Sequence, residues 1–396
     1  MGRNWTLILL AFVVTLPAVV LRLGGTSGQM AAGTGAVIFG VAILGGAFLL
    51  TWAAEVAEMD IAQGLALAFL ALVAVLPEYA VDLYFAWTAA VKPEYTAYAT
   101  ANMTGGNRLL IGIAWPLIML LYWTRTRRRR LRLPRSRAVE IVFLTLATGY
   151  SFVIPAKGTL SLIDMVVLVG LFVGYMWRLA GADKGEPDIV GPALALAGLS
   201  PWLRRLAVIV FFVFSAGVIL GSAEPFAESL VHLGRVRGID EFLLVQWLAP
   251  LASEAPEIVI ACILTLKGDA QAGMGAMVSS KVNQWTLLVG TLPLVYSVHL
   301  GHAGALHLDS RQIEEILLTS AQSLFGLAVL CNLRLSLFEA AVLFVLFASQ
   351  LLIPNPTARY GFALVYCTLG TAILVRSWKD LAALFRTGLG RRRVRG

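Results

Sequence analysis

Two apolar stretches of the chain each carry a Pro-Glu pair near the middle, Pro77-Glu78 and Pro256-Glu257. A carboxylate near the centre of a bilayer costs roughly 2.5–3.5 kcal/mol on insertion scales, so acids at such positions usually serve a function. A proline inside a helix removes a backbone donor and interrupts the regular hydrogen bonding. Two matched acids at interrupted helices therefore predict a site that binds a cation within the membrane.

The same prolines should leave backbone carbonyl groups without their helical partners. Pro77 is expected to free the carbonyl of Val73, and Pro256 that of Ala252, because a proline has no N–H to donate to the carbonyl four residues earlier. In lipid a freed carbonyl needs another partner. A bound cation supplies one, since carboxylate and carbonyl oxygens are the hard ligands that sodium and calcium prefer.

The stretch after each Pro-Glu helix is polar where a membrane span should be apolar. Hydroxyl and amide side chains recur there in both halves: Asn102, Thr104 and Asn107 in the first, and Ser279, Ser280, Asn283 and Gln284 in the second. Glycines accompany them, so the helix backbones can approach closely. We expect four helices, two from each half, to enclose an oxygen-lined cage.

The composition indicates which elements position these residues. The chain is 59% hydrophobic with a mean hydropathy of +0.80, and each apolar run of about twenty residues can cross a ~30 Å hydrocarbon core. The sequence therefore predicts an all-α polytopic membrane protein. Twelve transmembrane helices are expected, at 5–23, 33–57, 61–89, 95–123, 138–154, 160–178, 204–230, 240–266, 270–298, 313–331, 336–353 and 358–377.

The two halves of the chain resemble each other beyond the Pro-Glu pairs. SRAVEIVFLTLA at 136–147 matches SRQIEEILLTSA at 310–321, and 161–174 matches 336–349. Each repeat has five spans, and because five is odd the two repeats insert in opposite orientations. One flanking helix lies outside the repeat at each end. Inverted repeats with interrupted helices are typical of secondary transporters.

This organisation divides the chain into five parts. They are a first helix and external loop (1–30), a first inverted repeat (31–180), a cytoplasmic linker (181–203), a second inverted repeat (204–354), and a last helix with a basic tail (355–396). Within the repeats, the regions 61–123 and 240–298 contain the Pro-Glu helices and the polar helices that follow them.

The net charge of +8 comes largely from two basic stretches, at 125–137 and 386–396. Positive charge beside apolar spans marks the cytoplasmic side and faces anionic lipid. We therefore expect an integral protein of the plasma (inner) membrane with both termini in the cytoplasm and no nucleic-acid partner. The three cysteines lie in apolar runs and predict no disulfide framework.

These segments resemble the two alpha-repeats of the cation/calcium antiporter superfamily, the sodium/calcium exchangers. The family carries Gly-Thr-Ser-x-Pro-Glu on one helix and a Gly-Ser-Asn pattern on the next, and the regions 61–123 and 240–298 match it. The resemblance implies that Glu78 and Glu257 bind the transported ion. It implies further ion ligands at Ser253, Ser280, Asn107 and Gln284.

The chain also departs from the family pattern. Glu254 replaces a serine, Lys281 replaces the asparagine of the Gly-Ser-Asn triplet, and Arg108 is a second base at similar depth. Glu254 either coordinates the ion or forms a salt bridge with Lys281. We expect Lys281 and Arg108 to compensate buried charge, and the hypothesis for Lys281 is a counter-charge to Glu254 or Glu257 that replaces one sodium ion.

The resemblance implies sodium/calcium exchange by alternating access, with calcium, sodium or protons as the transported cations, no cofactor and no enzyme activity. One alternative is a proton-coupled exchanger of the same fold, and another is a membrane scaffold that has lost transport. A third is a metal-dependent membrane enzyme that uses the loop with His299, His302 and His307. Asp82 either lines an outer vestibule or faces lipid headgroups. The sequence leaves the oligomeric state open.

Overall fold

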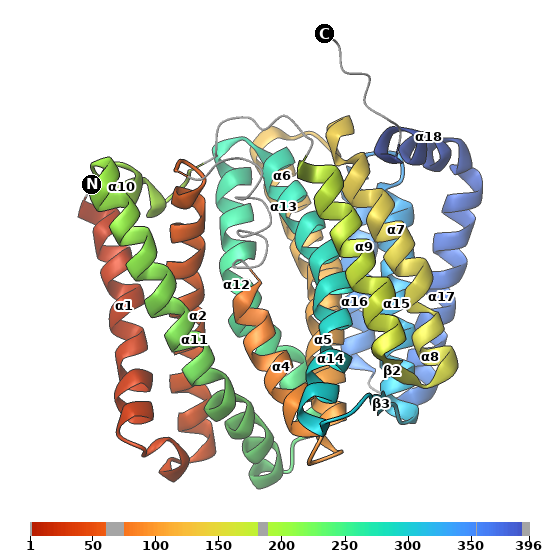
Figure 1. Ribbon diagram of the computed structural model, residues 1–396. Helices are drawn as coiled ribbons and strands as arrows, with labels where there is room; N and C mark the ends of the chain where they lie inside the picture. The colour runs from red at the N-terminus through yellow and green to blue at the C-terminus, as the bar shows by residue number, and fades with distance from the viewer. Residues whose placement is uncertain (1, 61–74, 181–188, 354, 390–396) are drawn as a thin grey trace. The chain divides into compact units, whose positions relative to one another are not determined.

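The computed structural model describes residues 2–60, 75–180, 189–353 and 355–389. The chain forms two compact units. The first comprises Met1–Gly106, Ala180–Ile260 and Val295–His302, and the second comprises Asn107–Leu179, Ala261–Leu294 and Ala303–Gly396. Nearly all of the described chain is helical, as Figure 1 shows.

Long helices make up the first unit. They are α1 (Gly2–Leu23), α2 (Ala32–Ala57), α4 (Leu76–Ala89), α5 (Tyr95–Leu109), α11 (Pro201–Arg237) and α12 (Glu241–Lys267), with the short helices η1 (Ser27–Gln29) and α10 (Ala193–Ala197) between them. The last residues of α5 and α12 belong to the second unit.

The core of the first unit lies among α1, α2 and α11. Phe12 of α1 meets Phe211 of α11 edge to face, with ring centroids 5.0 Å apart. Gly40 of α2 lies directly beneath the ring of Phe226, because an added Cβ would be 2.8 Å from a ring carbon. The small residues of α2 therefore allow α11 to pack closely along it.

Ala180 and residues 295–300 belong to the first unit, and the second unit contains the rest of the remaining elements. They are η2 (Leu110–Ala114), α6 (Trp115–Thr126), β1 (Arg130–Arg132), η3 (Arg135–Arg137), α7 (Ala138–Ser151), α8 (Val153–Lys157), β2 (Thr159–Ser161), α9 (Leu162–Ala180), α13 (Ala270–Asn283), η4 (Gln284–Leu288), α14 (Val289–Leu300), β3 (Ala305–His307), α15 (Ser310–Leu330), β4 (Arg334–Ser336), α16 (Leu337–Leu352), α17 (Pro356–Arg376) and α18 (Trp378–Leu389). Both η2 and η4 are π-helical turns.

Two short antiparallel pairings lie in predicted loops or at the first residues of predicted spans, where the sequence predicted no strand. β1 pairs with β4, with Leu131 opposite Leu335, and β2 pairs with β3, with Leu160 opposite Leu306. The central leucine of each strand is buried while its neighbours are more exposed. This alternation is what a strand with one covered face requires.

Close helix packing in the second unit again depends on glycine. A Cβ on Gly112 of η2 would come within 2.2 Å of the Phe347 ring of α16, and one on Gly370 of α17 within 3.2 Å of the Phe325 backbone of α15. The helix α17 is thereby packed tightly on α15.

Nine described helices are long and apolar enough to cross a membrane. Among the other three expected spans, the first is 61–89, of which residues 61–74 lie outside the described residues and the described part contains α4. The second is the series α13–η4–α14, which is helical throughout and includes one π-helical turn, and the third is the shorter apolar helix α16. The chain is thus an all-α polytopic membrane protein. The layout of twelve helices in two inverted repeats stays a prediction.

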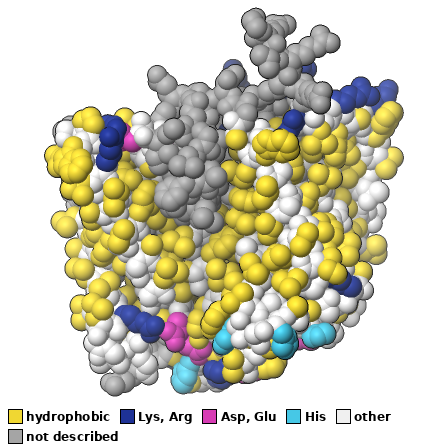
Figure 2. Space-filling view, in the orientation of Figure 1, with side chains coloured by type: hydrophobic (Ala, Val, Ile, Leu, Met, Phe, Trp, Pro, Cys, Tyr) yellow, Lys and Arg dark blue, Asp and Glu magenta, His cyan; other side chains and the backbone are white. Residues whose placement is uncertain are grey.

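The outward side chains fit a lipid environment. Hydrophobic side chains cover most of the face seen in Figure 2, and charged ones gather near the helix ends. Ile163 and Phe338 are 71% and 78% exposed. Large apolar side chains at such positions are stable when they face acyl chains.

Candidate functional site

The first Pro-Glu pair opens a helix. Helix α4 starts at Leu76, and Pro77 lies in its first turn. A backbone N–H in the first turn has no partner within the helix, so its absence in proline costs no helical hydrogen bond. Glu78 also lies in this turn and is only 4% exposed. The helix dipole favours negative charge at this end. The expected carbonyl of Val73 lies outside the described residues.

A second acid follows Glu78 on the same helix face. Asp82 comes one turn later and is 1% exposed, beside the side chain of Asn102 on α5. Burial excludes the position among lipid headgroups that was one of the two interpretations of Asp82. Helix α4 therefore places two buried carboxylates in line, the second of them next to the polar helix α5.

The second Pro-Glu pair does not interrupt its helix, contrary to the sequence-based expectation. Helix α12 runs without a break from Glu241 to Lys267 and includes both Pro250 and Pro256. A single proline removes one hydrogen bond, which a long helix packed on its neighbours can tolerate. Pro256 still has no N–H to offer the Ala252 carbonyl.

The polar side chains beside Pro256 differ in their surroundings. The Ser253 hydroxyl lies 3.3 Å from the carbonyl oxygens of Ala249 and Pro250, so it is held by its own helix. Glu254 is buried, whereas Glu257 is half-buried. Glu257 is thus the more accessible of these two acids, and Glu78 and Glu254 are the more enclosed.

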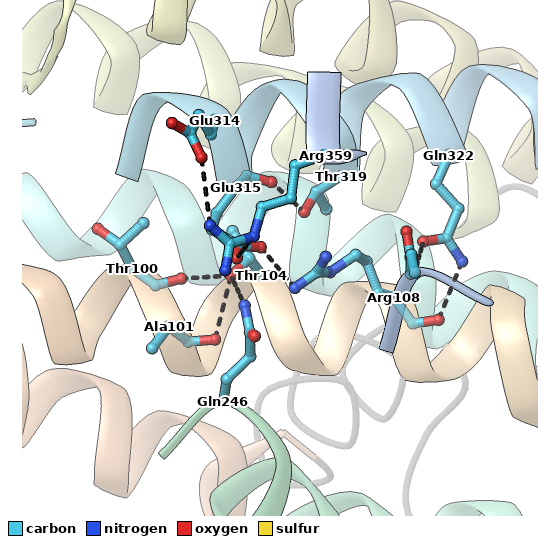
Figure 3. A network of polar contacts seen from close by, with 11 residues as sticks. Thr100, Ala101, Thr104, Arg108, Gln246, Glu314, Glu315, Thr319, Gln322 and Arg359 are labelled. Atoms are coloured by element: carbon cyan, nitrogen blue, oxygen red, sulfur yellow. Dashed lines mark hydrogen bonds and ion pairs between the residues drawn. The ribbon is translucent and has the colours of Figure 1, made fainter. Parts of the chain in front are cut away.

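Gln246 is a polar residue of the first unit that the sequence analysis missed. Its amide Nε2 donates to the Thr104 hydroxyl over 3.2 Å, and that hydroxyl donates to the Thr100 carbonyl over 2.7 Å, as Figure 3 shows. A Cβ on Gly105 would lie 1.8 Å from the Gln246 carbonyl oxygen. Pro250, four residues later, was the available signal, because it frees that carbonyl.

In the second unit the buried Lys281 binds Asn107. The Lys281 ammonium lies 2.7 Å from the side-chain oxygen of Asn107 and 3.1 Å from its carbonyl oxygen. It also lies 4.7 Å from the centre of the Trp285 ring. The sequence predicts Glu254 or Glu257 as its counter-charge, and the structure adds Asn107 as a partner.

The π-helical turns relate the two halves of this unit. Asn107 lies three residues before η2 (Leu110–Ala114), and Lys281 lies three residues before η4 (Gln284–Leu288). Asn107 and Lys281 are 174 residues apart. The first residues of η2 and η4 are separated by the same distance along the chain. Asn107 and Lys281 therefore hold equivalent positions before the two turns.

Arg108 belongs to a buried charge cluster. Its guanidinium lies 2.6 Å from Glu315, and Arg359 of α17 contacts both Glu315, at 3.0 Å, and Glu314, at 3.2 Å. Figure 3 shows these four side chains converging. Two bases and two acids balance. Arg108 thus compensates Glu315, an acid to which the sequence analysis gave no role.

Several buried polar atoms of α13 and η4 are open to a ligand. The Ser280 hydroxyl, the Asn283 side-chain oxygen and the Gln284 amide have no hydrogen-bond partner among the residues that the structure describes. Buried polar groups are rarely left so, and unsatisfied ones often mark a bound ion or water. Ser280 and Gln284 therefore remain candidate cation ligands.

Two histidines of the predicted loop, His299 and His307, lie in regular secondary structure. His299 stacks on Trp87 with ring centroids 4.1 Å apart, and its Nδ1 lies 2.6 Å from the Trp87 carbonyl oxygen. His307 lies within β3. No group of three or more His, Cys, Asp or Glu side chains in the described part of the chain is arranged to hold a metal. The described residues give the metal-enzyme alternative no support.

A comparison with protein families decides the identity. The family model described as "Sodium/calcium exchanger protein" matches residues 30–181 and 207–354. The chain belongs to the sodium/calcium exchanger protein family. It is therefore an integral membrane antiporter of the cation/calcium exchanger type.

Solved structures of this family share the fold. A crystal structure described as the H+/Ca2+ exchanger CAX is 44% identical, with a TM-score of 0.93 and 98% of both chains covered. YfkE is 17% identical, with a TM-score of 0.62 over 89% of this chain and 99% of its own. The sodium-calcium exchanger NCX_Mj is 17% identical, with a TM-score of 0.53 over 81% and 98%. No curated protein matches the chain.

Proposed function

We propose that the chain exchanges calcium ions for protons, with Glu78 and Glu257 as the carboxylates that bind them. The observation that carries the proposal is the burial of Glu78 beside a second buried acid, Asp82, on α4. A structure 44% identical over nearly the whole chain is described as an H+/Ca2+ exchanger. Proton coupling was the alternative to the sodium coupling that the motif resemblance implied.

The physical basis of exchange is competition for buried negative charge. An uncompensated carboxylate is costly in a medium of low dielectric constant, so each acid must hold a proton or face a cation. One calcium ion carries the charge of two protons. Two carboxylates that release two protons can therefore accept one calcium ion with no change in net charge, and release it on the other side when they are protonated again.

The proposed ligands on the first unit are oxygen atoms. They are the carboxylates of Glu78 and Glu257, the Ser253 hydroxyl, the Ala252 carbonyl and, as a further acid, Glu254. Carboxylate, hydroxyl and carbonyl oxygens are the ligands that calcium takes in flexible geometry. On the second unit, Ser280 and Gln284 stay proposed ligands of the transported cation, whereas the cation proposed on Asn107 is the Lys281 ammonium.

We also propose an orientation in the plasma membrane. Both termini lie on the cytoplasmic side, because the basic stretches at 125–137 and 386–396 would then face anionic lipid. The proposal is supported by the charge distribution alone.

Calcium-45 uptake into proteoliposomes tests the proposal. The vesicles are acidic inside and alkaline outside, with sodium absent, and wild type is compared with Glu78→Gln and Glu257→Gln. Uptake should require the pH gradient, and each substitution should reduce it by about two orders of magnitude or more, since a neutral amide cannot exchange a proton. Glu94→Gln, at an exposed acid, is the matched control and should transport normally.

Two results would overturn the proposal. Uptake that follows an outward sodium gradient and ignores the pH gradient would establish sodium/calcium exchange instead. Folded protein that shows no flux with either gradient, and no stabilisation by calcium, would indicate a scaffold that has lost transport.

A further inference from the structure

Lys281 is a charged side chain buried at a position where a protein seldom keeps one. It is 0% exposed on α13, and a buried ammonium is costly unless nearby groups replace its water. The groups that take the place of water around the Lys281 ammonium include the two oxygen atoms of Asn107, at 2.7 and 3.1 Å, and the face of the Trp285 ring. Carbonyl oxygens and an indole face are groups that bind simple monovalent cations as well.

The location of this ammonium is set by the repeat. Asn107 and Lys281 occupy the same position before the π-helical turns η2 and η4. An asparagine at 281 would therefore bring two amide side chains from equivalent positions together. Their oxygens, with the Asn107 carbonyl, would form a small oxygen-lined site, and π-helical turns often occur beside such sites.

We propose that the Lys281 ammonium is a tethered cation that occupies a monovalent-cation site on Asn107 and so excludes sodium from the exchange cycle. The inference rests on the proposed proton/calcium exchange and explains its selectivity. An ammonium and a sodium ion compete for the same oxygens and cannot occupy one place together. Because the lysine is covalently attached, this positive charge stays in the protein on every cycle.

The test is to vacate the site and supply sodium. Lys281→Asn removes the ammonium and adds an amide oxygen, and Lys281→Gln does so with a longer side chain. Lys267→Asn removes an exposed lysine of α12 and is the control. Calcium-45 uptake driven by a pH gradient is measured with sodium or potassium on both sides. The melting temperature of the purified full-length chain is measured in the same two salts.

Wild type and Lys267→Asn should respond equally to sodium and potassium in both measurements. Lys281→Asn should bind sodium, so that sodium raises its melting temperature and changes calcium uptake by about tenfold, a usual size for coupling between two ligands. The melting temperature reports binding even if uptake is lost.

The inference is overturned if Lys281→Asn and Lys281→Gln fold and neither melting temperature nor uptake distinguishes sodium from potassium. It is also overturned if both variants fail to fold in either salt, because Lys281 then only connects helices. Wild-type uptake driven by sodium alone would instead refute the proposed proton coupling. The two failures are therefore distinguishable.

Discussion

Gln246 shows how one residue joins two elements of the first unit. Its side chain donates to Thr104, and its carbonyl, which Pro250 deprives of a helical donor, faces the backbone at Gly105. Side chain and main chain of the same residue thus contact successive residues of α5. Glycine is required at 105 because no Cβ fits there.

Gly105→Ala should destabilise the protein and abolish tight packing of α5 against Gln246. The added Cβ would lie 1.8 Å from the carbonyl oxygen, so the backbones must separate, and overpacking of this kind costs about 1–3 kcal/mol. The melting temperature should fall accordingly. Gly149→Ala, at an exposed helical glycine with nothing within 4 Å, should leave it unchanged or raise it. Equal effects of the two substitutions would contradict the argument.

At the scale of elements, α17 is attached to the rest of the second unit by charge as well as by packing. Arg359 reaches the two acids of α15, and one of these, Glu315, also holds Arg108. The two bases of this cluster, Arg108 and Arg359, come from distant parts of the sequence. A buried cluster stabilises its arrangement only while all partners are present.

Glu315→Gln should destabilise the fold by about 3–5 kcal/mol, because it leaves two buried guanidinium groups with one acid fewer. Thermal or denaturant unfolding in detergent measures the loss. The control is Glu241→Gln, which removes the acid of an exposed pair with Arg235 and should cost at most about 1 kcal/mol. Similar losses in the two variants would show that the buried cluster has no special role.

Features that a short stretch of sequence determines could be predicted, and features that depend on contacts between distant residues could not. Spans such as α2 and α15 followed from hydrophobicity, and the acids at 78 and 257 stood out because they interrupt apolar runs. The continuity of α12 through Pro256 could not be predicted, since it depends on packing that outweighs one lost hydrogen bond. The contacts of Arg108 with Glu315 and of Lys281 with Asn107 join residues far apart in sequence, where no local pattern reports them.

At the scale of the whole molecule, a chain with a net charge of +8 becomes more positive in acid, and this self-repulsion opposes folding. At the same low pH, carboxylates outside the spans become protonated and lose their ion pairs with basic residues. Asp60, after α2, accepts from Arg204 at 2.7 and 2.9 Å and from Arg205 at 3.1 Å. Hydrogen bonds from Arg204 hold the pKa of Asp60 below its ordinary value of 3.8.

Asp60→Asn should lower stability near neutral pH but not in strong acid. A carboxyl whose pKa is lowered by folding stabilises the protein above its unfolded pKa, and loses this effect as the pH falls through the folded value. The melting temperatures of wild type and variant, measured across a pH series, should therefore converge below about pH 4. Glu94→Gln, at an exposed acid, should give no such difference. A gap that stays constant with pH would exclude this role for Asp60.

The pairing of β1 with β4 has a consequence for synthesis of the chain. Arg130 pairs with Ser336, so at 5–20 residues per second β1 leaves the ribosome roughly 10–40 seconds before its partner exists. During that interval its backbone is an open strand edge, which other chains can join. The strand is short, and Arg130 and Arg132 flank its buried leucine. Short length and positive charge both discourage pairing at an exposed strand edge, so we expect Arg130 and Arg132 to limit pairing of β1 with other chains until β4 has been synthesised.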